Sequence, residues 1–111
     1  MKNNEKLFEN LKKFFENLDF IDFALVFGSY AKEKVLPISD LDIAIHTSKE
    51  LEFLEIGNLI SEMEKITKKE VDLVILNGIY QKNPLLAYNI ISEGILIFLI
   101  INLFTKQLIK H

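Results

Sequence analysis

The stretch Phe27–Ile45, FGSYAKEKVLPISDLDIAI, carries the residues that decide the fold. Gly28 and Ser29 follow an apolar run, and glycine at such a turn lets the backbone approach a bound group closely. Further along, Asp40 and Asp42 stand one residue apart at the start of a second apolar run. Because side chains alternate faces along a strand, we expect both carboxylates on one face. The turn suits a phosphate chain and the acid pair suits a divalent metal, so the stretch predicts an enzyme that handles a nucleoside triphosphate.

The composition indicates one compact domain with a substantial apolar core. The chain has 111 residues, half of them hydrophobic and nine of them Phe, so we expect a single domain over residues 1–111. The net charge is −3 and no basic run is present, which disfavours general nucleic-acid binding because phosphate neutralisation dominates that affinity. Cysteine is absent, so neither a disulfide scaffold nor a cysteine-ligated zinc site is expected.

The sequence gives no sign of membrane insertion or secretion. The N-terminal residues MKNNEKLFEN lack the apolar stretch of a secretory signal. The most apolar run, Ile95–Ile101, is far shorter than the ~20 residues that cross a bilayer. We therefore expect a cytoplasmic protein. All thirteen basic residues are Lys, so positive charge in a site must come from Lys, a metal or a partner chain.

Hydrophobic periodicity predicts helices that alternate with strands. The expected helices cover residues 4–17, a segment that begins near Thr47 and ends at the Lys65–Lys69 cluster, and residues 84–94; the expected strands cover residues 20–27, 41–46, 71–76 and 95–101. Thr47 and Glu50 have the spacing of a capping box, and Asn83 followed by Pro84 has the form of a helix start. The fold class expected from this order is α/β (α+β), with a small mixed β-sheet flanked by helices.

Asp72 adds a third acid to the pair in the opening stretch. It interrupts the apolar run VDLVIL, and its neighbours predict a largely buried strand, where an unpaired charge is costly. If this strand lies beside residues 41–46, Asp72 joins Asp40 and Asp42 in one site. We expect the three acids to hold Mg²⁺ shared with substrate phosphates, and Asp72 to act as general base for an incoming hydroxyl.

The remaining candidates are nucleotide-binding or structural residues. Gly28 and Ser29 are expected to bind phosphate oxygens, and Lys32 and Ser39 are further nucleotide-binding candidates. A solvated lysine and a serine that stabilises the loop are the alternatives for those last two positions. His46 is interpreted as structural because it stands at a strand end. Asp19 and Asp22 are interpreted as turn residues beside the first strand.

Taken together, these residues resemble the polymerase β-type nucleotidyltransferase superfamily. Its pattern is a Gly-Ser turn after a strand, a DxD on the next strand and a third acid on a later strand, here Asp72. The words GSYAK, SDLDIAI and VDLV and the small size are most similar to the minimal nucleotidyltransferases, the MNT proteins. The resemblance implies the polymerase β-like fold and an antitoxin that transfers AMP from ATP to a tyrosine of a partner HEPN ribonuclease toxin. Glu33 stands where that family often has glycine.

Two other functions stay open from the sequence. One is a transferase for a small molecule, as in the aminoglycoside-modifying members of the superfamily. The other is a non-catalytic module that neutralises a partner by contact through the apolar surface of residues 79–104. The same apolar C-terminal region is a candidate for homo- or hetero-oligomer contacts.

Overall fold

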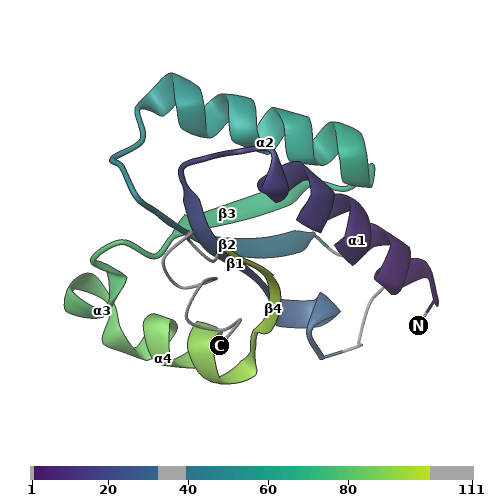
Figure 1. Ribbon diagram of the computed structural model, residues 1–111. Helices are drawn as coiled ribbons and strands as arrows, with labels where there is room; N and C mark the ends of the chain where they lie inside the picture. Colours follow the sequence, from purple (N-terminus) through teal and green to yellow (C-terminus); the bar gives the residue numbers. More distant parts are fainter. Residues whose placement is uncertain (1, 33–39, 101–111) are drawn as a thin grey trace, which may run out of the picture.

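The structure is a computed structural model that describes residues 2–32 and 40–100 (Figure 1). Its elements are α1 (Lys2–Glu16), β1 (Ile21–Phe27), the 3₁₀ helix η1 (Gly28–Tyr30), β2 (Leu41–Thr47), α2 (Phe53–Thr67), β3 (Val71–Ile75), α3 (Ile79–Lys82), α4 (Pro84–Glu93) and β4 (Ile95–Leu99). A four-stranded mixed sheet with helices around it confirms the predicted fold class. Within the described residues, no helix is long and apolar enough to cross a membrane.

The order of the strands brings the termini of three strands together at one end of the sheet. The order is β3-β2-β1-β4, with β1 antiparallel to both β2 and β4. The strands β2 and β3 are parallel, as a crossover through α2 allows. The register pairs Phe27 with Asp42 and Asp42 with Asp72. The end of β1 therefore meets the beginnings of β2 and β3.

Helices cover both faces of the sheet, with α1 and α2 on one face and α3 and α4 on the other (Figure 1). The strand β2 divides its side chains between these faces by simple alternation. Ile43 and Ile45 are fully buried against α1 and α2, whereas Ala44 packs with Ile90 of α4. The strand that carries Asp42 is thus held in place by core residues on both faces of the sheet.

The predicted start of the second helix is wrong. Thr47 is the last residue of β2, not a helix cap, and α2 begins at Phe53. The side chain of Asn77 binds the Thr47 backbone on both sides, accepting from its amide at 3.1 Å and donating to its carbonyl at 2.8 Å. This clip keeps Thr47 extended. The capping box is formed instead by Glu52 and Glu55, where the Glu52 amide donates to Glu55 Oε1 at 3.0 Å.

The third predicted helix is confirmed and is preceded by an unpredicted turn of helix. Asn83 caps α4, because its Oδ1 accepts from the Leu86 amide at 3.2 Å, and Pro84 is the first helical residue. The short helix α3 occupies residues that the sequence left unassigned. The strand β4 ends at Leu99, short of the predicted limit, and residue 101 lies outside the described part.

Candidate active site

The Gly-Ser turn lies directly against the acid pair. Gly28 has φ +71°, a left-handed conformation that L side chains rarely adopt, and a Cβ added there would overlap Asp42 Oδ2. The turn continues into η1, where the Ala31 amide donates to the Gly28 carbonyl at 3.1 Å. Two independent constraints, backbone conformation and space, thus require glycine at position 28. Ser29 follows it in the first turn of η1, partly buried.

The structure places two of the predicted acids, Asp72 and Asp40, near the third, Asp42. The parallel register places Asp72 opposite Asp42, and Asp40 lies just before β2 with its side chain exposed. Burial raises the pKa of Asp42, and the negative charges of Asp72 and Asp40 raise it further, together with a hydrogen bond to Asp72. Neither these two charges nor the burial favours the ionised form of Asp42, so the site has an excess of negative potential.

The expectation that Asp72 is buried is wrong. Its side chain is exposed, although Val71 beside it is buried. Asp72 stands at the beginning of β3, an edge strand, whereas the residues of α4 pack against Val74 farther along that strand. An exposed carboxylate next to Asp42 is accessible to a reacting group from solvent or from a partner.

The acids have the chemistry of a site for a hard divalent cation. Within residues 2–32 and 40–100, no three His, Cys, Asp or Glu side chains converge closely enough to hold a metal as they stand. Nevertheless, Asp40, Asp42 and Asp72 supply only carboxylate oxygens, which Mg²⁺ prefers, and their repulsion is the feature that a cation would relieve. The residues therefore fit such an ion, and these three are the ones that would hold it.

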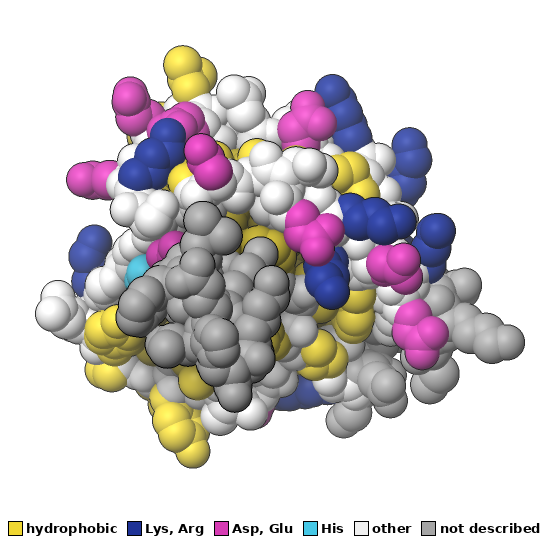
Figure 2. Space-filling view, in the orientation of Figure 1, with side chains coloured by type: hydrophobic (Ala, Val, Ile, Leu, Met, Phe, Trp, Pro, Cys, Tyr) yellow, Lys and Arg dark blue, Asp and Glu magenta, His cyan; other side chains and the backbone are white. Residues whose placement is uncertain are grey.

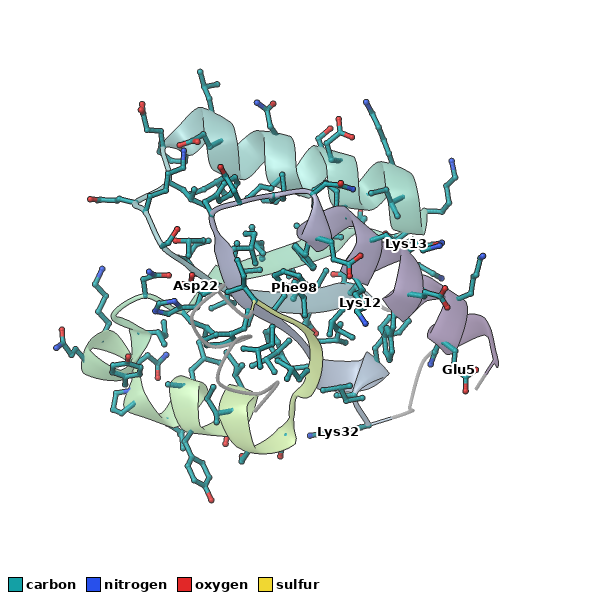
Figure 3. The ribbon with its side chains drawn as sticks, in the orientation of Figure 1. Glu5, Lys12, Lys13, Asp22, Lys32 and Phe98 are labelled. Atoms are coloured by element: carbon teal, nitrogen blue, oxygen red, sulfur yellow. The ribbon has the colours of Figure 1, made fainter. Side chains whose placement is uncertain are left out.

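The structure does not place the other two predicted nucleotide-binding residues, Lys32 and Ser39, against the three aspartates. Lys32 Nζ lies 3.4 Å from Glu93 Oε1, and Figure 3 shows its side chain extending from the turn toward the last turn of α4. Its contact with a phosphate stays a prediction. Ser39 and Glu33 lie outside the described residues.

His46 makes a pair that the sequence did not reveal. Its Nδ1 lies 2.9 Å from Asp22 Oδ2, and its ring stacks on Phe23 with centroids 5.3 Å apart. Asp22 is a strand residue of β1, so its interpretation as a turn residue is wrong. The register shifts between Ile21 and Phe23, so Asp22 is the extra residue of a bulge. A bulge breaks the alternation, which explains why both Asp22 and its neighbour reach the same histidine.

A cavity of about 700 Å³ lies at the opposite end of β2 and β3 from the acids. Its lining includes Lys49, Asn77 and Lys82 and contains none of the three aspartates. Size alone assigns no chemistry to it. The candidate active site is the end of the sheet that carries Gly28 and the three aspartates, because Gly28 packs against Asp42 and the negative charges are clustered there.

Comparison with known proteins identifies the family. Residues 9–100 match the family model "Polymerase beta, Nucleotidyltransferase". A Methanocaldococcus jannaschii protein named "Putative protein adenylyltransferase MJ0435" is 35% identical over 72 residues, which are 65% of this chain and 74% of that protein.

Solved structures share the fold. A chain of a crystal structure described as a toxin-antitoxin with AMP-PNP superposes with TM-score 0.70 at 21% identity, covering 99% of this chain and 86% of that chain. A chain of the tri-AMPylated Shewanella oneidensis HEPN toxin in complex with MNT antitoxin gives TM-score 0.64 at 19% identity, covering 88% and 73%. With the family model matched over residues 9–100, the chain belongs to the polymerase beta nucleotidyltransferase family.

Proposed function

We propose that this protein transfers AMP from ATP, with Mg²⁺, to a hydroxyl of a partner protein, and that the acceptor is a tyrosine of a HEPN ribonuclease toxin. The observation that carries the proposal is the packing of Gly28 on Asp42, beside Asp72 and Asp40, in a chain of this family. The name of the archaeal relative and the descriptions of the toxin-antitoxin structures support a protein acceptor. Such a partner pair operates in the cytoplasm, where ATP and ribonuclease substrates are found.

The residues of this chain divide the work of the transfer. The backbone amides and hydroxyl at Gly28 and Ser29 bind phosphate oxygens and orient the triphosphate. Asp40, Asp42 and Asp72 would hold Mg²⁺, which would supply positive charge to offset the charge of the phosphates. Asp72, exposed at the sheet edge, accepts the proton of the acceptor hydroxyl. The hydroxyl oxygen then bonds to the α-phosphorus as the bond to pyrophosphate breaks.

A second candidate is a non-catalytic antitoxin that neutralises its partner by contact. Exposed apolar side chains favour it: Tyr80, Leu85, Tyr88 and Ile91 of α3 and α4 are 58–69% exposed. Figure 2 shows apolar side chains over α3 and α4, whereas charged ones gather over α1 and α2. Contiguous apolar surface of this kind is typical of an interface.

One experiment separates the two candidates. The protein is incubated with ATP labelled at the α-phosphate, Mg²⁺ and a purified HEPN toxin as the acceptor. Transfer predicts label on a toxin tyrosine, lost with Asp42→Asn and kept with Asp19→Asn, an equally conservative change at an exposed aspartate before β1. If no label appears and the doubly substituted Asp40→Asn, Asp42→Asn protein still neutralises the toxin, the contact candidate replaces the catalytic one. Label on an aminoglycoside instead would indicate a small-molecule transferase.

A further inference from the structure

An ion pair ties the candidate nucleotide turn to the end of α4. Lys32 Nζ lies 3.4 Å from Glu93 Oε1, and the two side chains are 55% and 49% exposed. Lys32 follows η1, whose Gly28 contacts Asp42, and Glu93 is the last residue of α4. The lysine expected to contact phosphate therefore already has an anionic partner from another element.

The backbone on both sides of this pair is fixed. The Lys32 amide donates to the carbonyls of Gly28 and Ser29, each at 3.2 Å. On the other side, the Gly94 amide donates to the Ile90 carbonyl at 2.8 Å, and a Cβ at Gly94 would come within 3.4 Å of Leu25 Cβ on β1. The backbone at Lys32 is thus held by η1 and the backbone after Glu93 lies against β1, whereas the two side chains of the pair are long and flexible.

Glu93 and a bound triphosphate would compete for the positive charge of Lys32. Within the described residues, none of Asp40, Asp42 and Asp72 forms an ion pair with a lysine. A triphosphate bound at the turn brings several negative charges within the range of this one flexible cation. An exposed ion pair of this kind changes an equilibrium constant by no more than about fivefold, which corresponds to about 1 kcal/mol. Breaking the Lys32–Glu93 pair so that Lys32 can bind a phosphate therefore requires little free energy.

We propose that Glu93 is a positioning residue that competes with the triphosphate for Lys32, so that the lysine exchanges partners when nucleotide binds. The inference rests on the proposed function and adds to it a residue that sets nucleotide affinity. Glu93 acts through Lys32 and touches no reacting atom. It weakens nucleotide binding and leaves the chemical step unchanged.

A double-mutant cycle tests the exchange. The Kd of AMP-PNP with Mg²⁺ is measured for the wild type, Glu93→Gln, Lys32→Met and the double variant. Glu93→Gln alone should tighten binding by roughly two- to fivefold. Lys32→Met should weaken binding, and adding Glu93→Gln to it should change nothing further. Glu62→Gln, which removes the exposed Lys65–Glu62 pair on α2, is the matched control and should leave the Kd unchanged.

Kinetics supply the second readout. With the HEPN acceptor, Glu93→Gln should lower the KM for ATP by the same factor and leave kcat unchanged. An equal tightening with and without Lys32 would overturn the inference, because Glu93 would then act through its own charge alone. If the wild-type protein binds AMP-PNP but labels no acceptor, the proposed function is contradicted. The double-mutant cycle then still tests whether Glu93 competes with the nucleotide for Lys32. A wild-type protein that binds no AMP-PNP overturns both.

Discussion

Replacing Gly28 with alanine tests the central packing of the site. At φ +71°, an L residue costs about 1–2 kcal/mol relative to glycine, which for a small domain lowers Tm by roughly 5–15 °C. The added Cβ also overlaps Asp42 Oδ2, so the carboxylate must turn away from its place beside Asp72. Moving a residue of the active site by about 1 Å costs on the order of a hundredfold in the rate of the reaction.

Gly78 offers a matched control for the backbone effect. It has φ +73°, nearly the same as Gly28, and a Cβ there meets nothing within 4 Å. Gly78→Ala should therefore lose similar stability in thermal unfolding and keep its rate of AMP transfer, measured well below both Tm values. If Gly28→Ala transfers AMP as fast as Gly78→Ala, the close approach of the turn to Asp42 has no catalytic role.

Three further predictions concern the acids and the clip on β2. The pKa of Asp42 is raised in the folded chain by burial and by Asp72 and Asp40, so its ionisation destabilises the fold as pH rises past its unfolded value. Asp42→Asn should therefore raise Tm at pH 7, with a gain that shrinks as the pH falls to about 4 and below. Mg²⁺ should raise the wild-type Tm by more than that of Asp42→Asn, because bound cation offsets the repulsion; equal shifts would contradict the metal site. Asn77→Ala removes the two hydrogen bonds to the Thr47 backbone and should cost about 2 kcal/mol in urea unfolding with AMP transfer intact, whereas an unchanged midpoint would show that the clip is dispensable.

Local pattern was sufficient wherever the determining residues lie close together in the chain. Asn83 and Pro84 begin α4 as predicted, because the cap and its acceptor are three residues apart. Alternation along β2 placed Asp42 away from the core residue Ile43 for the same reason. The start of α2 was mispredicted since Thr47 is held in β2 by Asn77, thirty residues later. A capping-box spacing at Thr47 cannot register that competing contact.

Features that depend on strand order were beyond the sequence. The apolar run around Asp72 predicted burial, but β3 is an edge strand and its carboxylate is exposed. The Asp22–His46 pair depends on a bulge that suspends alternation between Ile21 and Phe23. Both outcomes follow from which strands are neighbours and in which register, and local sequence pattern does not specify either.

The charge balance of the site argues for a cation from outside the chain. Asp42 lies between Asp72 and Asp40, and the packing of Gly28 leaves its carboxylate little room to turn away. Within the described residues, the nearby Lys32 is paired with Glu93 rather than with any of the three acids. A buried core on both faces of the sheet holds β1 and β2 in place, so the strands cannot separate to relieve the repulsion. The fold thus preserves a cluster of carboxylates that is unfavourable by itself, and a divalent cation of the kind proposed above would offset its repulsion.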